Sequence, residues 1–134
     1  MTFEVVEYKG LRYAEILYCN AQNESTQFYS EKKSALQLGV MSHPTGFVER
    51  AHFHPVVERE ATSTQQAFFV ISGVIIVDFF DQDGEIIRSI NLESGDAILI
   101  IQGVHRIRVV EKSICVTVKQ GPFVAELDKV ELSF

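Results

Sequence analysis

Two histidines separated by a single residue, His52 and His54, are the side chains of this chain best suited to metal or acid–base chemistry. In an extended strand successive side chains point to opposite faces, so both imidazoles project from one face and Phe53 from the other. Imidazoles that converge with side chains of neighbouring strands are good ligands for Zn²⁺ and Fe²⁺. The surrounding stretch from Gly46 to Gly73 also places carboxylates and two glutamines between apolar runs. We therefore expect this stretch to organise a ligand pocket.

His105 supplies a third imidazole from a distant part of the chain. A lone histidine in a strand is usually structural, but an H-x-H pair together with a third histidine favours a pocket. His43 precedes a proline in a turn, and we expect it at the surface. Glu58 and Arg59 fit a solvated charged loop, with the alternative that one of them reaches the mouth of the pocket.

Length and composition indicate one folded domain that spans residues 1–134. The chain is 46% hydrophobic and contains three prolines and eight glycines, which is typical of a globular protein. Its net charge of −6 argues against a nucleic-acid or anionic-membrane partner, because both recruit basic surfaces. No apolar run approaches the roughly 20 residues that cross a bilayer. The N-terminus lacks the pattern of a secretory signal, so we expect a cytoplasmic protein.

Short apolar runs separated by turn residues predict roughly ten β-strands and no long helix. Ser72-Gly73 and Asp81–Gly84 are expected to close hairpins, and Ser94-Gly95-Asp96 is expected to form another turn. Residues 20–34 are polar and are expected to form a long loop. Arg106 and Arg108 alternate with Ile107, which places them on the face opposite the ligand and exposes them to solvent. The pattern indicates an all-β sandwich or barrel, with strands at 3–8, 11–18, 35–41, 47–53, 66–71, 74–80, 85–92, 97–101, 105–110 and 113–119.

The spacing of glycines and histidines matches two motifs of one family. Gly46, five residues and then His52-Phe53-His54 fit the pattern G-x5-H-x-H, and Gln66 to Gly73 fit its second half with glutamine in place of glutamate. A second motif, G-x5-P-x-G-x2-H, is matched more loosely between Gly95 and His105, where the histidine comes one residue early.

On these motifs, within residues 46–73 and 95–105, the chain resembles the cupins, which are jelly-roll β-barrels that hold a ligand at the barrel mouth. It is most similar to small single-domain cupins of uncharacterised activity, which share H-x-H-P-x-V-E-R and V-K-Q-G-P segments. Such proteins are found with sugar-nucleotide and surface-polysaccharide pathways. The resemblance therefore implies a cupin barrel with a polar substrate, for which a sugar derivative is one candidate.

The resemblance also implies a divalent metal ion, which would be Fe²⁺, Mn²⁺, Ni²⁺ or Zn²⁺. Carried over residue by residue, the expected ligands are His52, His54, Gln66 and His105. Glutamine is a weaker ligand than the usual carboxylate, since it cancels none of the ion's charge. Glu58 could take its place if the loop that carries it folds inward.

Three functions follow as alternatives, and the sequence leaves open whether the protein is an enzyme. The first is a metal-dependent enzyme that acts on a small molecule. The second is a metal-free sugar epimerase or isomerase, in which His54 or His52 abstracts a proton beside a carbonyl. The third is a module that binds a small polar ligand without turnover. Because cupins associate through their sheets and the N-terminal strands are apolar, we also expect a homodimer.

Overall fold

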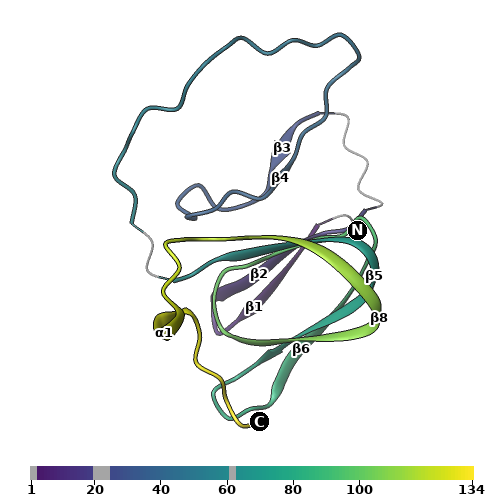
Figure 1. Ribbon diagram of the computed structural model, residues 1–134, viewed down its shortest axis with the longest axis vertical. Coiled ribbons are helices and arrows are strands. Elements are labelled where there is room, and N and C mark those ends of the chain that lie inside the picture. The colour runs from purple at the N-terminus through teal and green to yellow at the C-terminus, as the bar shows by residue number, and fades with distance from the viewer. Residues whose placement is uncertain (1–2, 20–24, 61–62) are drawn as a thin grey trace.

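The computed structural model describes residues 3–19, 25–60 and 63–134, and it confirms an all-β protein. One antiparallel sheet, with the order β1-β2-β7-β5-β6 and with β8 also paired to β5, curls into a half-barrel (Figure 1). A separate hairpin pairs β3 with β4. In the described residues no helix is long and apolar enough to cross a membrane. The elements are β1 (Phe3–Tyr8), β2 (Leu11–Leu17), β3 (Gln27–Phe28), β4 (Gly39–Val40), β5 (Gln66–Phe80), β6 (Ile86–Glu93), β7 (Ala97–Ile100), β8 (Val104–Lys119) and the short helix α1 (Ala125–Asp128).

The half-barrel is built on two long strands, β5 and β8, each of which replaces two shorter predicted strands. They pair from Gln66 opposite Lys119 to Phe80 opposite Val104, with register shifts near the middle. The expected hairpin at Ser72-Gly73 is therefore wrong, because the chain bends there and continues in the same ladder. At Gly73 the backbone has a φ of +85°, and an added Cβ would overlap the backbone of Lys112 on β8. Only glycine allows the two bent strands to approach so closely.

A polar contact joins the two ends of the main sheet. Arg88 on β6 donates to Glu4 Oε2 on β1 at 2.7 Å and to the carbonyl oxygen of Val5 at 3.3 Å. Tyr18 donates to the same carboxylate oxygen at 3.0 Å, and its burial together with this bond raises the Tyr18 pKa to about 12. Since β1 and β6 are the first and last strands of the order, these bonds hold the curl of the sheet.

The concave side of the half-barrel encloses the main hydrophobic core. Ile75, Val77 and Phe79 alternate along β5 and are at most 1% exposed, and Ile90 and Leu92 meet them from β6. Burying a side chain of this size contributes about 1.5–3 kcal/mol. A smaller apolar cluster lies on the other side of β7 and β5 and includes Leu17, Leu38, Ala67, Ala97 and Leu99.

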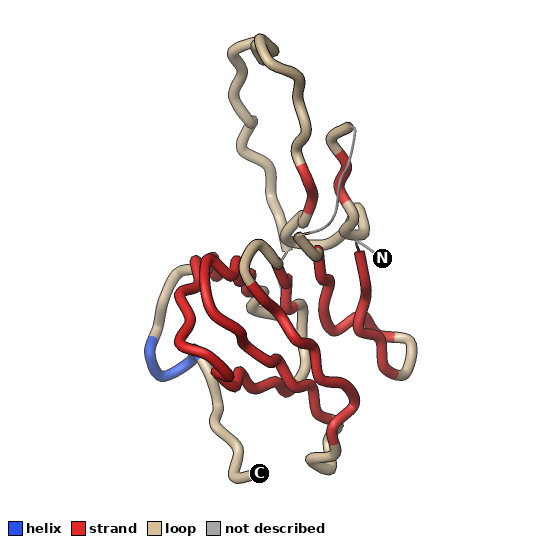
Figure 2. Tube along the Cα trace, turned by 90° about the vertical axis from the view of Figure 1, so that its right-hand side faces the viewer, coloured by secondary structure: helices blue, strands red, loops and turns tan. Residues whose placement is uncertain are grey.

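The strand predicted at 35–41 is reduced to the two residues of β4, which pair with β3. The strand predicted at 47–53 is wrong, because no strand of the described residues pairs with this stretch. Residues 43–60, which we call the projecting segment, are exposed throughout and rise away from the sheet beyond the β3–β4 hairpin (Figures 1 and 2). Alternating apolar residues form a strand only where a neighbouring strand accepts their backbone hydrogen bonds, and here none does.

Two predicted turns are confirmed, and each is fixed by an aspartate. Asp96 is buried, and its carboxylate accepts from the backbone N–H of Cys19 at 2.7 Å and of Glu93 at 2.9 Å. Asp81 accepts from the backbone N–H of Asp83 and of Glu85, both at 2.9 Å. These bonds replace the backbone partners that a chain reversal leaves unpaired.

Candidate functional site

His52 and His54 lie on the projecting segment, where they are neighbours but are not in a strand. Their ring centroids are 5.2 Å apart. His52 Nδ1 lies 2.8 Å from the carbonyl oxygen of Arg50 and 3.0 Å from Glu49 Oε1. Both of these are acceptors, so Nδ1 is the nitrogen placed to donate, and Nε2 makes neither contact. The pair thus offers at least one nitrogen that could bind a cation or accept a proton.

His105 lies elsewhere, at the start of β8. Its ring is 6.4 Å from that of Phe79, which is its register partner on β5. His105 Nδ1 lies 2.9 Å from the carbonyl oxygen of Gly103, so here too Nε2 is the ring nitrogen outside this contact. A carbonyl that accepts from Nδ1 is the usual outer partner of a metal-binding histidine.

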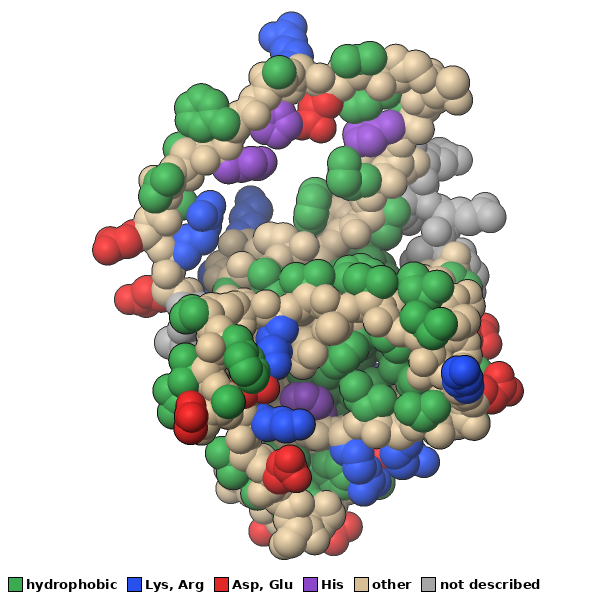
Figure 3. All heavy atoms as spheres, in the orientation of Figure 1, with side chains coloured by type: hydrophobic (Ala, Val, Ile, Leu, Met, Phe, Trp, Pro, Cys, Tyr) green, Lys and Arg blue, Asp and Glu red, His purple; other side chains and the backbone are tan. Residues whose placement is uncertain are grey.

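Gln66 opens β5, and its side chain is already bonded. Its Nε2 donates to Thr117 Oγ1 on β8 at 3.0 Å. The structure brings His52 to His54 but does not bring either of them to His105. Histidines lie both on the projecting segment and on the sheet in Figure 3, well apart. Within the described ranges, no three His, Cys, Asp or Glu side chains are grouped so that they could hold a metal ion.

Arg106 and Arg108 share one face of β8 as predicted, and their side chains are 44% and 47% exposed. Both donate to Asp78 on β5, a fully buried carboxylate that the sequence analysis missed. Ser89 on β6 donates to Asp78 at 2.6 Å as well. The bonds from Arg108, Ser89 and Arg106 hold the Asp78 pKa well below its usual range, even though burial opposes the charge. In return, the Asp78 carboxylate raises the pKa of Arg108.

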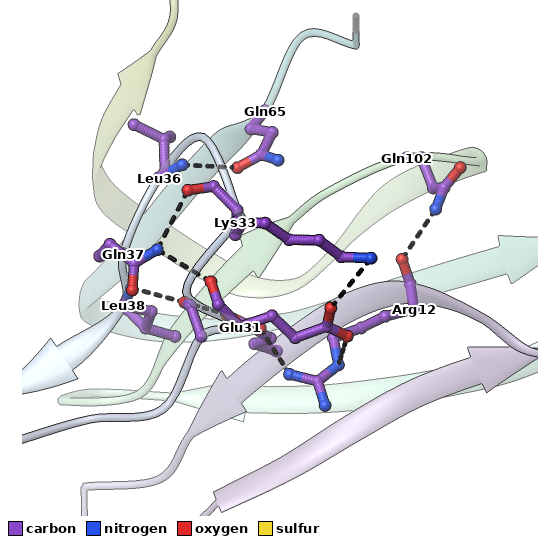
Figure 4. A network of polar contacts seen from close by, with 11 residues as sticks. Arg12, Glu31, Lys33, Leu36, Gln37, Leu38, Gln65 and Gln102 are labelled. Atoms are coloured by element: carbon purple, nitrogen blue, oxygen red, sulfur yellow. Dashed lines mark hydrogen bonds and ion pairs between the residues drawn. The ribbon is translucent and has the colours of Figure 1, made fainter. Parts of the chain in front are cut away.

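A polar cavity of about 360 Å³ lies between the start of β2, the 31–35 loop and the turn that follows β7. We call it the β2 cavity, and its polar network is drawn in Figure 4. Gln102 closes one side and donates from Nε2 to the carbonyl oxygen of Arg12 at 3.1 Å. Its polar lining residues are Arg12, Glu15, Glu31, Lys33, Ser34, Glu60, Ser63, Gln65 and Gln102.

A buried ion pair forms one wall of the β2 cavity. Glu15 is fully buried, and its Oε2 accepts from Arg12 at 2.9 Å while Oε1 accepts from the Ser30 hydroxyl. Arg12 Nε is 3.8 Å from Glu31 Oε1, which is too long for a hydrogen bond. Arg12 therefore neutralises the buried carboxylate and keeps one N–H unused.

Two buried polar atoms of the β2 cavity have no hydrogen-bond partner, Arg12 Nε and Ser34 Oγ. Buried polar groups are nearly always hydrogen-bonded in folded proteins, because leaving one unpaired costs about 1–3 kcal/mol. Both atoms belong to residues that line the same cavity. The arrangement suits a bound molecule that supplies the missing acceptors.

Sequence reasoning missed the β2 cavity because its residues come from separate parts of the chain, and those of the 31–35 loop belong mostly to the polar stretch that we expected to be a loop. One signal was present: Glu15 interrupts the apolar run Ala14–Leu17, as Asp78 interrupts Val74–Phe80. A carboxylate inside a buried strand must be paired, so each of these residues marked a polar network. No protein-family model, curated protein or solved structure matches the chain.

Proposed function

We propose that this protein binds a small polar ligand in the β2 cavity, with the half-barrel as a rigid support. The observation that carries the proposal is the pair of unsatisfied buried atoms, Arg12 Nε and Ser34 Oγ, on one cavity of about 360 Å³. A volume of that size accommodates a small molecule. The proposal corresponds to the third function expected from the sequence, a ligand-binding module.

The lining of the cavity favours a hydroxyl-rich ligand of low charge. Glu15 and Glu31 present acceptors, while Arg12, Lys33 and Gln102 present donors. A sugar offers hydroxyl groups that both donate and accept, so it can satisfy both kinds of residue. A strongly anionic ligand would be repelled by the three carboxylates of the lining, Glu15, Glu31 and Glu60. This agrees with the sugar-derived ligand that the cupin resemblance implies.

The test is ligand-dependent thermal stabilisation with a panel of neutral hexoses, hexuronic acids and nucleotide-linked hexoses. A ligand at 100 times its dissociation constant stabilises the folded state by about 2.7 kcal/mol, which is a measurable rise in Tm. Lys33→Met should weaken binding of the active compound. Lys32→Met is the matched control, because Lys32 is an exposed neighbour that does not line the cavity. A panel without any stabilising compound would contradict the proposal.

A metal site is the second candidate, and it is favoured by the nitrogen geometry of His52 and His105. In both residues Nδ1 faces a carbonyl oxygen, which leaves Nε2 as the nitrogen that could bind a metal ion. The predicted set of His52, His54, Gln66 and His105 is not assembled in this arrangement, so it does not yet fit an ion, and we derive no catalytic step through one. Of the four predicted ligands, His52 and His54 are the two whose rings the described structure places close together.

Elemental analysis of the purified protein tests this second candidate. If the predicted ligands hold Fe, Mn, Ni or Zn, His52→Ala and His105→Ala should each lower the metal content. His43→Ala is the control, since His43 lies on the projecting segment and stacks on Phe47 at a centroid distance of 4.2 Å. Metal-free protein that still binds a sugar would leave the ligand-binding proposal intact and remove the metal site.

A further inference from the structure

Strand β8 is an open edge. It runs for 16 residues and, in the described part of the chain, pairs only with β5. Hydrophobic side chains gather over this side of the molecule in Figure 3. Long apolar edges are templates for pairing with another chain, and proteins normally shorten, charge or cover them. Five branched apolar residues of β8 are between 51% and 61% exposed: Val109, Val110, Ile114, Val116 and Val118.

The projecting segment is an extended stretch with which no strand of the described residues pairs. Between Val48 and Glu60 no backbone–backbone hydrogen bond joins it to any described residue. Its large apolar side chains are among the most exposed of the molecule, with Val48 at 86%, Phe53 at 83% and Val56 fully exposed. One chain thus carries an unpaired strand edge and an unpaired extended segment, and both are apolar.

The placement of the two features favours contact between chains. The projecting segment extends beyond the β3–β4 hairpin and away from the sheet in both the ribbon and the tube view, so it reaches outward rather than over its own β8 (Figures 1 and 2). Their charges are also complementary. When Asp78 and Asp128, the carboxylates bound by Arg106, Arg108 and Lys119, are counted with it, β8 keeps a net charge of +1, whereas the segment, with three glutamates and two arginines, has a net charge of −1. Opposite charges of this kind help to orient two partners as they meet.

We propose that β8 is a dimer surface, and that it is covered by the projecting segment of a second copy of this chain. Residues 47–54 of the second copy would add a strand to the unpaired edge, and Pro55, which lacks a donor, would end the ladder. Each chain carries both halves of the contact. The exchange is therefore reciprocal and closes as a two-fold dimer instead of growing into a fibre.

Sedimentation of the wild-type protein and of two double variants tests the exchange. The β8 variant is Val109→Glu with Val116→Glu, and the segment variant is Val48→Glu with Phe53→Glu. All four side chains are exposed in the single chain, so the fold should be retained, which circular dichroism can verify. Each double variant should raise the dimer dissociation constant roughly 30-fold or more, because charges replace central apolar contacts. Ile86→Glu, at an exposed isoleucine of β6, is the matched control and should not change it.

Mixing the two double variants separates exchange from other arrangements. The β8 variant keeps a normal segment and the segment variant keeps a normal β8, so an equimolar mixture can form one of the two contacts. The mixture should contain a heterodimer although each variant alone is monomeric. A monomeric wild-type protein whose segment amides resist hydrogen exchange would overturn the proposal, since the segment would then cover its own β8. A dimer that resists both double variants, or a mixture that stays monomeric, would also overturn it.

Discussion

The curled sheet and the projecting segment have similar alternating sequences but opposite environments. Phe79 on β5 is fully buried, whereas Phe53 on the segment is 83% exposed. Along β5, the strand β8 lies on one edge and β7 and β6 lie on the other. Most of β5 therefore has a neighbouring strand on both edges. Among the described residues, no strand pairs with the segment. Apolar alternation therefore specifies which side chains share a face, while burial depends on a partner that the local sequence does not name.

The largest expected difference between the two regions is in the cost of removing an aromatic ring. In dilute protein, Phe79→Ala should lower the free energy of unfolding by about 4 kcal/mol, because it leaves a cavity in the core. Phe53→Ala should lower it by less than about 0.5 kcal/mol, because the ring lies in solvent. Urea denaturation followed by circular dichroism measures both. Equal costs would show that the segment packs into the core of its own chain.

Two glycines with the same backbone angle sharpen the comparison. Gly73 in β5 and Gly46 in the segment both have a φ of +85°, but an added Cβ would overlap Lys112 only at Gly73 and would meet nothing at Gly46. Gly73→Ala should therefore cost about 3 kcal/mol, from the backbone angle and the overlap together. Gly46→Ala should cost at most about 1 kcal/mol, from the angle alone. Thermal denaturation of the two variants tests this, and a Gly46 variant as unstable as the Gly73 variant would contradict it.

Replacing a carboxylate within the sheet should lower the free energy of unfolding more than replacing one on the C-terminal tail. Asp78→Asn should cost about 2 kcal/mol, since it weakens four hydrogen bonds from Ser89 and two arginines and a further ion-pair contact with Arg106. Asp128→Asn should cost about 0.5 kcal/mol or less, because its pair with Lys119 is partly exposed. Urea denaturation near neutral pH measures the two costs.

The same carboxylate predicts a dependence on pH. The folded pKa of Asp78 lies below the ordinary value of about 3.9, so its stabilisation is complete above about pH 5. It is lost as the pH falls below about 4 towards the folded pKa. The Asp78→Asn variant should therefore lose less stability than the wild type between pH 5 and pH 3. An identical loss in both proteins would show that Asp78 does not carry this acid sensitivity.

The smallest expected effect is a gain in stability where the loop next to β3 meets the sheet. Ser34→Ala removes a buried hydroxyl without a partner and should raise the free energy of unfolding of the ligand-free protein by up to about 1 kcal/mol. The same variant should bind the ligand of the β2 cavity more weakly. Ser42→Ala is a control outside the cavity. A loss of stability without ligand would indicate that the Ser34 hydroxyl is satisfied in solution.

Turn chemistry was the part of the fold most directly readable in the sequence. The turns at Ser94–Asp96 and Asp81–Gly84 lie where they were predicted, because aspartate and glycine fix them locally. The prediction of a hairpin at Ser72-Gly73 was wrong although it also rested on a glycine. Glycine permits a chain reversal, but it equally permits the close approach of two bent strands. Local sequence cannot distinguish the two, because the second depends on β8, which lies far along the chain.

By itself, the sequence determined that this chain is built of β-strands, where most of them lie and which of their side chains share a face, since these follow from period-two alternation and turn residues. Only the tertiary structure decided which strands meet. Pairing between distant segments left His52 and His54 apart from His105, joined Asp78 to two arginines, and enclosed Glu15 and Arg12 in a polar cavity. The physical reason is that backbone hydrogen bonds and buried charges need partners, and those partners come from parts of the chain that no local pattern identifies.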